Sequence, residues 1–408
     1  MDRRSFLQTT AAAAGSMALG FPSALLGEDK KLPVAAVVTD YSNNTHADVI
    51  IGKILEGFDQ KGGPGPALKL VAMYTDQVPK DDLSRGLAEK HGFRIAKTID
   101  EAITFGTDKL QVSGVLSIGE HGTYPYTPGT KQHMYPRRRF FDGVAATFQR
   151  VGQVVPVFSD KHLAYNWADA KHMYDIAIEM KIPFMAGSSL PVTWRRPPLE
   201  LPLGCEIESA LAVGYGGPES YGFHALETLQ CMIERRKGGE SGVASVQALQ
   251  GDAIWKARDK GAWSEELLTA VLQTMPGGKK GEPSERLSKN AAFYQIEYRD
   301  GLKATVAMAN GLAAQFGFAA KLRGQSEPAA TWFELEETKP FGHFAYLTRA
   351  IDHMIQAGKP AYPVERTLVT TGILDRAMHS LAASGQQYET PELEISYNPT
   401  DWPFANRA

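Results

Sequence analysis

The sequence predicts an α/β protein in which a Rossmann-like, doubly wound parallel sheet is followed by an α+β domain with an open, mostly antiparallel sheet. Over residues 31–187, short β-branched runs alternate with helical patterns, as a parallel sheet with crossover helices requires. Over residues 188–390, the candidate strands become longer and look antiparallel. The 408 residues, 43% of them hydrophobic, suffice for two or three domains of roughly 150 residues each.

The first half contains the elements of the parallel sheet. Apolar runs predict buried strands over residues 33–38, 68–74, 112–118 and 182–187. Helices are predicted over residues 49–58, 83–91 and 163–180, and a further short element leads through residues 99–103. Gly92 is a good C-terminal cap for the second helix. The third helix repeats apolar residues every three or four positions, which places them on one face: Leu163, Trp167, Ala170, Tyr174 and Ala177.

The second half is predicted to form a mixed or antiparallel sheet that helices cover on one side. Its candidate strands are residues 243–250, 292–298, 302–308, 311–322 and 331–335. Asp300-Gly301 lies between two alternating runs and favours a hairpin. Helices are predicted over residues 345–357 and 365–384, ended by glycines. Residues 276–284 form a low-complexity loop, and residues 391–408 form a polar, aromatic tail.

The composition excludes several kinds of partner and site. The 43 Lys and Arg residues face 46 Asp and Glu residues, and the net charge of −3 gives no long-range field for a polyanion, so we expect no nucleic acid partner. Cys205 and Cys231 are too few for a disulfide framework or an all-cysteine zinc site. We expect two buried thiols, and a single bridge between them stays open. After the N-terminal segment, no run reaches the roughly 18 apolar residues of a membrane span.

Residues 1–30 have the features of an export signal. Arg3-Arg4 is followed by Phe6-Leu7, by an apolar Ala- and Gly-rich stretch over residues 11–26, and by small residues near 22–24. This pattern resembles a twin-arginine signal, which exports proteins already folded. We therefore expect a periplasmic or exported protein from which this segment is cleaved. A disordered basic N-terminus is the alternative.

Several short motifs follow one another in a distinctive order along the rest of the chain. They are residues 87–92 (Leu-Ala-Glu-Lys-His-Gly) with 98–101 (Thr-Ile-Asp-Glu), 160–164 (Asp-Lys-His-Leu-Ala), 222–227 (Gly-Phe-His-Ala-Leu-Glu), and 358–360 (Gly-Lys-Pro) with 380–385. In this order they resemble motifs of the Gfo/Idh/MocA family of nicotinamide-dependent sugar oxidoreductases. The family's counterparts are, in turn, its second helix with the acidic segment after it, its Glu-Lys-Pro-Leu-Ala motif, its Gly-x-His-x-x-Asp helix start and its C-terminal signature. The resemblance spans residues 32–391 and implies NAD or NADP as the cofactor.

The predicted cofactor site departs from the usual dinucleotide pattern. Glycines normally follow the first strand, because side chains there would keep the pyrophosphate from the helix N-terminus. Here the turn over residues 39–45 contains no glycine, and Asp40 puts a negative charge where phosphates would lie. We expect the cofactor to contact six residues: Thr39, Asp40, Tyr41, Asp76, Glu120 and His121. Asp76 is the candidate for the ribose diol. A Tyr41 side chain that filled the opening would instead favour a relative without catalysis.

By the same resemblance, Lys161 and His224 would manage the proton of a sugar hydroxyl during hydride transfer. Lys161 follows a predicted strand and opens a helix, a position that faces the ligand crevice of such a sheet. The apolar positions of the helix that carries His224 face elsewhere: Phe223, Leu226, Leu229 and Ile233. The family's aspartate four residues before the histidine is Ser220 here, with Glu219 beside it. A solvated lysine and a structural histidine are the simpler alternatives.

Residues 120–141 are the most unusual segment and are predicted as a polar, aromatic loop. It holds Glu120, His121, Tyr124, Tyr126, Lys131, His133, Tyr135, Arg137, Arg138 and Arg139. Because it follows a strand's carboxyl end, we expect substrate contacts from Tyr124, Tyr135, Arg137 and Arg138, with arginines clamping the carboxylate of an acidic sugar. Glu120, His121 and His133 lack the spacing of a metal site, so no metal is expected. A solvated excursion or a subunit contact is the alternative.

These observations predict an exported oxidoreductase, similar to Gfo/Idh/MocA enzymes, that acts on a sugar or sugar derivative with tightly bound NAD or NADP. Because free dinucleotide is absent outside the cytoplasm, we expect a redox-neutral cycle of oxidation, elimination and re-reduction. Two alternatives stay open. One is a carbohydrate-binding or scaffold protein that has lost dinucleotide binding, and the other is a cofactor-free lyase or hydrolase using Glu120, His121 and Tyr135. A homo-oligomer also stays open.

Overall fold

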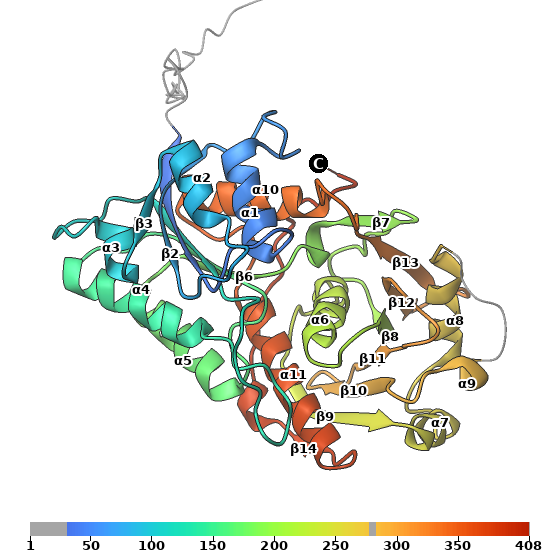
Figure 1. Cartoon of the computed structure of the whole chain (residues 1–408). Helices are drawn as coiled ribbons and strands as arrows, with labels where there is room; N and C mark the ends of the chain where they lie inside the picture. The colour runs from blue at the N-terminus through green and yellow to red at the C-terminus, as the bar shows by residue number, and fades with distance from the viewer. Residues whose placement is uncertain (1–30, 277–282, 408) are drawn as a thin grey trace, which may run out of the picture. The chain divides into compact units, whose positions relative to one another are not determined.

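The computed structural model describes residues 31–276 and 283–407. The predicted export-signal segment and most of the low-complexity loop lie outside these residues. Two sheets organise the described chain (Figure 1): one takes its strands from residues 32–187, and the other from residues 194–389. The predicted boundary at residues 187 and 188 falls between them, and the domain ranges themselves stay predictions.

The first sheet is parallel throughout, with the strand order β3-β2-β1-β4-β5-β6. Its strands are β1 (Leu32–Val38), β2 (Leu68–Thr75), β3 (Arg94–Ala96), β4 (Gly114–Ile118), β5 (Val157–Asp160) and β6 (Phe184–Gly187). The strand order reverses between β1 and β4, and doubly wound sheets bind their ligands at such a switch point. This confirms the Rossmann-like prediction.

The helices of the first half begin where side chains cap them. They are α1 (His46–Glu56), α2 (Ser84–His91), α3 (Ile99–Thr104), α4 (Arg137–Val151) and α5 (Trp167–Glu179). The α1 helix begins three residues before its predicted start, because Oγ1 of Thr45 accepts a hydrogen bond from N of Asp48. The α5 helix begins four residues after its predicted start, because Oδ1 of Asn166 caps it by accepting a hydrogen bond from N of Asp169 at 2.8 Å. The segment after β5 is thereby left free to line the site.

The arginines at 137–139 were expected in a loop, and this expectation is wrong. They form the first turn of α4, which presents an apolar face to the first sheet: Phe140, Phe141, Val144, Ala145 and Phe148. These residues recur at spacings of three and four, the pattern of an amphipathic helix. The charged residues at the start of the helix concealed that pattern.

The second sheet is mixed and mostly antiparallel, with the order β14-β9-β10-β11-β8-β12-β13-β7. Its strands are β7 (Trp194–Arg196), β8 (Ile207–Gly214), β9 (Val243–Gln250), β10 (Ala292–Tyr298), β11 (Lys303–Met308), β12 (Phe316–Leu322), β13 (Ala329–Glu334) and β14 (Tyr388–Glu389). The hairpin at Asp300-Gly301 is confirmed by the antiparallel pairing of β10 and β11. The sequence did not predict β8, which lies inside the sheet and pairs in parallel with β11.

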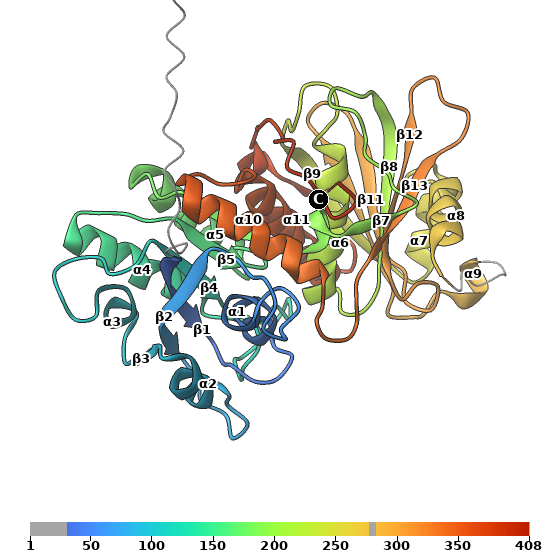
Figure 2. The same ribbon diagram turned by 90° about the horizontal axis from the view of Figure 1, so that it is seen from above.

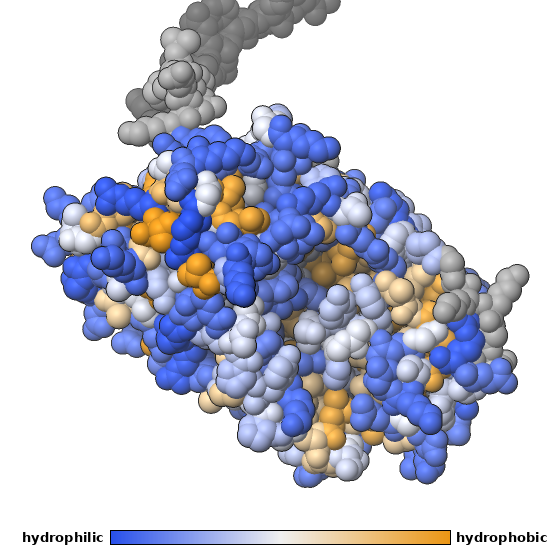
Figure 3. Space-filling model, in the orientation of Figure 1, coloured by the Kyte–Doolittle hydropathy of each residue, from blue (hydrophilic) through white to orange (hydrophobic). Residues whose placement is uncertain are grey.

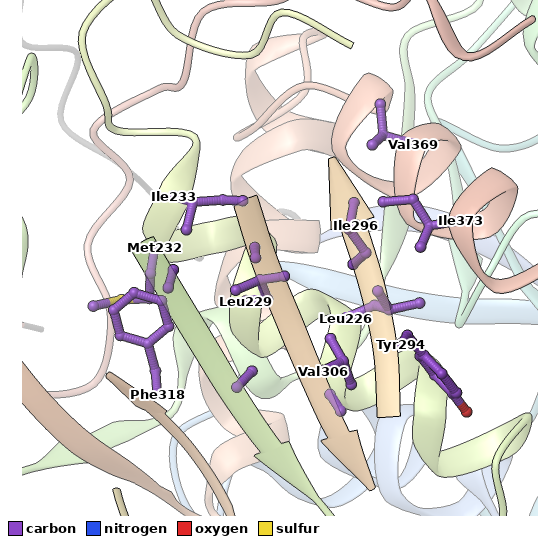
Figure 4. Close-up of a cluster of buried hydrophobic side chains, with 14 of the residues drawn as sticks. Leu226, Leu229, Met232, Ile233, Tyr294, Ile296, Val306, Phe318, Val369 and Ile373 are labelled. Carbon is purple, nitrogen blue, oxygen red and sulfur yellow. The ribbon is translucent and has the colours of Figure 1, made fainter. Parts of the chain in front are cut away.

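Helices cover both faces of the second sheet, where the sequence predicted only one covered face. On one face, α6 (Ser220–Ile233) and α11 (Glu365–Ala382) pack on side chains such as Ile296 and Val306 (Figure 4). On the other face lie α7 (Asp252–Asp259) and α8 (Glu265–Thr274) (Figure 2). Trp263 and Leu268 pack there on Phe293, so side chains of both faces are buried. A short α9 (Pro283–Arg286) follows. The sheet stays open at β14 and β7.

The C-terminal helices connect the two sheets. The α10 helix (His343–Ala357) follows the second sheet in sequence but packs on the first, through Leu347 and Ile351. Along α11, Leu368 belongs to a core cluster of the first sheet and Ile373 to that of the second. The C-terminal tail also packs on the protein core, through the 3-10 helix η2 (Pro391–Leu393). The 3-10 helix η1 (Leu190–Val192), which follows β6, is buried as well. Among the described helices, none is long and apolar enough to cross a membrane.

Candidate active site

A cavity of about 900 Å³ lies where the carboxyl ends of β4 and β5 meet the N-terminal ends of α1, α6 and α10. In the view of Figure 3, the surface is hollowed beside α6, and apolar residues are visible in the hollow. Six of the ten histidines of the chain line the cavity: His46, His121, His133, His162, His224 and His343. The cavity therefore offers many nitrogen donors and acceptors at the place where this kind of sheet binds ligands.

The two predicted catalytic residues meet in this cavity. Nζ of Lys161, after β5, lies 2.6 Å from Nε2 of His224, on α6. Their side chains are only 6% and 11% exposed. Lys161 has a φ of +67° and its N–H donates to the carbonyl of Gly187 at 3.1 Å. A left-handed backbone is unusual for lysine and often marks a functional position.

Glu120, after β4, lies between two buried cations. Its Oε1 is 3.5 Å from Nζ of Lys161, and its Oε2 accepts a hydrogen bond from the guanidinium of Arg137. Burial alone would raise the pKa of Glu120, but Lys161 and Arg137 outweigh burial and hold the pKa well below its usual range. Glu120 is therefore an anion that holds the ammonium of Lys161 in place.

Arg137 is buried beneath the cavity wall, although the sequence predicted a substrate contact. Besides Glu120, it donates to Nε2 of His162 at 3.1 Å. Because arginine can only donate, this nitrogen of His162 carries no proton. Burial and the charge of Arg137 together lower the pKa of His162 well below its usual range. Arg137 thus supports the cavity wall and does not line it.

Glu219 is a cavity residue that the sequence indicated only as the neighbour of Ser220. It lies just before α6, and its Oε1 accepts from N of His133 at 3.1 Å. Burial raises the pKa of Glu219 to about 7. The carboxyl can therefore carry or release a proton near neutral pH. The available signal was an acidic residue at the start of the helix that carries His224.

Aromatic rings form two walls of the cavity. On one side, Tyr126 stacks on His133 with ring centroids 4.2 Å apart, and His133 lies 3.9 Å from Tyr135. On the other side, Tyr221 stacks on Phe316 with centroids 6.0 Å apart. All five residues line the cavity, so Tyr135 is placed where the sequence predicted it. Such walls suit the C–H faces of a sugar ring.

Of the predicted cofactor residues, Glu120 and His121 line the cavity, whereas Thr39, Asp40, Tyr41 and Asp76 do not. Tyr41 is fully buried in the core under α1 and leaves the opening free. Asp40 is also buried, and burial, together with Asp81 and Asp82, raises its pKa. The acid of the first turn therefore does not face the cavity.

Asp76 and Tyr124 are bound to each other and not to the cavity. The carboxylate of Asp76 accepts from the hydroxyls of Tyr74 at 2.8 Å and Tyr124 at 2.7 Å, and from Arg139 at 2.6 Å. These contacts fasten the loop after β4 to the end of β2. Three donors thus already occupy Asp76, and the hydroxyl hydrogen of Tyr124 is committed to it. Arg138 is exposed and pairs with Asp169, away from the cavity.

The described residues fit the nicotinamide half of a dinucleotide better than the adenosine half. Asn44, His46 and Val49 line the cavity, so the first turn of α1 opens into it and offers the positive end of the helix dipole to a phosphate. At the other end, the occupied Asp76 removes the expected ribose contact. Over residues 31–276 and 283–407, no group of three His, Cys, Asp or Glu side chains is placed to hold a metal ion. Cys231 is buried and Cys205 half-buried, both as free thiols.

Several dehydrogenases of known structure share this fold. GenD2 from gentamicin A biosynthesis, in complex with NAD, matches with a TM-score of 0.54 and 14% identity, over 88% of this chain and 96% of that chain. An oxidoreductase from Agrobacterium radiobacter, in complex with NAD+, L-tartaric acid and magnesium, matches with a TM-score of 0.52 and 14% identity, over 88% of this chain and 98% of that chain. A myo-inositol 2-dehydrogenase from Lactobacillus plantarum matches with a TM-score of 0.52 and 12% identity, over 88% of this chain and 99% of that chain.

Neither a protein-family model nor a curated protein sequence matches the chain. At the identities of the structural matches, the similarity establishes the fold alone. It confirms the two-part fold that the resemblance to Gfo/Idh/MocA enzymes implied.

Proposed function

We propose that the protein is an oxidoreductase that uses NAD or NADP to oxidise a hydroxyl group of a sugar or polyol. The observation that carries this proposal is the 2.6 Å contact between Lys161 and His224 in a cavity at the ligand-binding edge of a Rossmann-like sheet. The printed descriptions of the structural neighbours, which include NAD complexes and an inositol dehydrogenase, support the same class of reaction.

The residues divide the work between proton handling and positioning. Lys161 would take the proton of the substrate hydroxyl, and His224 would fix the orientation of Nζ through their hydrogen bond. Glu120 would keep the lysine in place by its charge. Asn44, His46 and Val49 would hold the phosphates of a dinucleotide, and Glu120 and His121 would hold its nicotinamide, which would supply the hydride acceptor.

The charge of the cavity favours a neutral or amino-bearing substrate over an acidic one. Its lining contains four carboxyl groups and two ammonium groups: Glu120, Glu219, Glu336, Glu337, Lys131 and Lys161. Arg137 and Lys161 neutralise Glu120, and Glu219 is partly protonated at neutral pH, so Glu336 and Glu337 are the carboxylates that set this preference. Within the described ranges, arginines are absent from this lining, so the predicted clamp for an acidic sugar has no residue to form it. Carboxylates accept hydrogen bonds from hydroxyl and ammonium groups and repel a sugar acid.

The place of action extends the proposal. We propose, as the twin-arginine resemblance implies, that the protein works outside the cytoplasm with a cofactor that was loaded before export. A resident dinucleotide must then be regenerated on the protein, which supports a redox-neutral cycle in which one substrate carbon is oxidised and later reduced. Detection of the cleaved protein in a periplasmic fraction, and its loss in an Arg3→Lys/Arg4→Lys variant, tests the location.

The cofactor is tested on the exported, signal-free protein. The protein is denatured, and the released small molecules are examined by absorbance and mass spectrometry. In parallel, thermal unfolding is followed with added NAD, NADP or neither. We expect either released dinucleotide or a higher unfolding temperature with one of the two. Absence of both would overturn the proposal.

A second candidate function is binding of a carbohydrate without redox chemistry. The occupied carboxylate of Asp76 and the glycine-free first turn favour it, because both weaken the adenosine half of a dinucleotide site. This candidate predicts a higher unfolding temperature with sugars or polyols and an unchanged one with either dinucleotide.

A further inference from the structure

A continuous chain of polar contacts leads from Lys161 into the protein interior. Nζ of Lys161 contacts Nε2 of His224 at 2.6 Å, and Nδ1 of His224 contacts Oγ of Ser188 at 3.0 Å. The hydroxyl of Ser188 donates to Oε2 of Glu227, and N of Ser188 donates to both carboxylate oxygens at 3.0 and 3.1 Å. Glu227 ends the chain, and its side chain is 1% exposed.

The backbone is shaped to admit this carboxylate. Gly187 has a φ of +122°, and a Cβ atom there would lie 2.5 Å from Oε1 of Glu227. Any other residue at this position would therefore collide with the carboxylate and adopt a rare backbone conformation. Glycine at the end of β6 allows Glu227 to reach the N–H and the hydroxyl of Ser188.

When Glu227 is ionised, the hydrogen bonds fix where the protons lie. Ser188 has one hydroxyl hydrogen, and it is donated to Glu227. Nδ1 of His224 must then carry a hydrogen and donate to Oγ of Ser188. Its Nε2 is left with a free lone pair, which accepts from the ammonium of Lys161. Burial, reinforced by the charge of Lys161, holds the pKa of His224 well below its usual range, so the ring is neutral.

We propose that Glu227 stores the proton that Lys161 must lose before it can act as a base, and that His224 and Ser188 carry it there. This inference rests on the proposed function. One proton passes from Nζ of Lys161 to Nε2 of His224, one from Nδ1 of His224 to Oγ of Ser188, and one from Oγ of Ser188 to Oε2 of Glu227. His224 and Ser188 each gain one proton and lose one. The result is a neutral amine and a neutral carboxylic acid, without a change in total charge.

The surroundings of Glu227 make both protonation states accessible. Burial raises its pKa to about 7, while the hydrogen bonds from Ser188 and the charges of Arg366 and Lys161 oppose burial. The titratable and charged groups that face it are His224 on α6, Arg366 on α11, Lys161 after β5, and the neutral Tyr362 and Cys231. Arg366 is already bound to Glu234 through two hydrogen bonds, at 2.9 and 2.6 Å. Among the described residues, Glu227 therefore has no lysine or arginine within ion-pair distance that would keep it charged, and its contact to His224 at 3.9 Å involves a neutral ring.

The experiment compares pH profiles of turnover in matched variants. Glu227→Gln keeps the size and a hydrogen-bonding oxygen but cannot store a proton, and Ser188→Ala interrupts the chain while leaving Glu227 in place. In both, Lys161 must lose its proton to solvent, so the acid limb of kcat moves to higher pH and kcat at neutral pH falls by about tenfold or more, with KM little changed. Thr370→Val removes a buried hydroxyl on α11 outside the chain and should leave the profile unchanged.

A second measurement does not depend on turnover. Nitrogen NMR of ring-labelled histidine, with the His224 signals assigned by their loss in His224→Gln, should show Nδ1 protonated and Nε2 unprotonated. In Ser188→Ala, this tautomer preference should weaken. If Lys161→Met abolishes turnover but Glu227→Gln keeps the wild-type pH profile, the proton store is refuted and the proposed function stands. If no dinucleotide binds, the proposed function fails, and a ring of His224 protonated on both nitrogens at neutral pH would refute the relay separately.

Discussion

Nζ of Lys161 lies 2.6 Å from Nε2 of His224, although 63 residues separate them along the chain. Lys161 follows β5, at the carboxyl ends of the strands of the first sheet, and His224 lies on α6, a helix that covers the second sheet. The contact therefore exists only when both sheets are formed and docked. It places Lys161 in a buried environment where a hydrogen-bonding partner is already in position.

Replacement of His224 should lower turnover more than it lowers stability. In His224→Gln, the lysine loses its 2.6 Å partner and its path to Ser188, and we expect kcat to fall by about a hundredfold, in the range of general acid–base effects. His172 pairs with Asp142 away from the cavity, so His172→Gln is the matched control and should keep wild-type kcat. Equal kinetics in the two variants would remove His224 from the mechanism.

Glu219 should make stability depend on pH. Its pKa is about 7 in the folded protein, raised by burial from the ordinary value of 4.5. The folded state then binds more protons than the unfolded state between these values, so the free energy of unfolding falls as pH rises from about 4.5 to about 7. Glu219→Gln removes this penalty and should be more stable than the wild type at pH 8, by on the order of 2 kcal/mol. Chemical denaturation at pH 5 and pH 8 measures the difference, and no gain at pH 8 would contradict the burial of this carboxyl.

Asp76 should matter for the loop after β4 and not for the choice of cofactor. Asp76→Ala removes the acceptor of Tyr74, Tyr124 and Arg139, and we expect a loss of about 1–3 kcal/mol in the free energy of unfolding. The relative affinity for NAD and NADP should stay within about twofold. Urea denaturation measures the loss of stability, and calorimetric titration measures the relative affinity for NAD and NADP. A large change in cofactor preference would restore Asp76 to the ribose site.

Arg138 should not contribute to substrate binding. It is 44% exposed and pairs with Asp169 and Asp142 on the surface. Such pairs contribute about 0–1 kcal/mol to stability, so Arg138→Ala should keep the KM of the wild type and nearly all of its stability. A severalfold rise in KM would show that the segment closes over the substrate and would revive the clamp expected from sequence.

The sequence predicted the parts of the molecule that depend on local pattern. Four strands of the first sheet (β1, β2, β4 and β6), the hairpin at Asp300-Gly301 and the pair Lys161 and His224 follow from hydrophobic periodicity, turn chemistry and motif order. The start of α4 was missed because three arginines look like a loop. Periodicity alone also missed α7 and α8, which cover the second face of the sheet.

Contacts between distant segments could not be predicted in the same way. Glu227 meets Ser188 across 39 residues, and Asp76 meets Tyr124 across 48. Whether an acid binds a cofactor, supports a loop or holds a proton is decided by such neighbours. An acidic side chain is common to these cases and does not by itself distinguish them.

The most direct measurement of the central claim is a single-turnover experiment on protein loaded with oxidised dinucleotide. Neutral polyols, amino sugars and sugar acids are added in turn, and the absorbance of reduced nicotinamide is followed. We predict that a neutral or amino-bearing polyol reduces the bound nicotinamide in the wild type, and that Lys161→Met, equally loaded, stays oxidised while Lys171→Met reacts normally. Reduction at the wild-type rate in Lys161→Met would contradict the account.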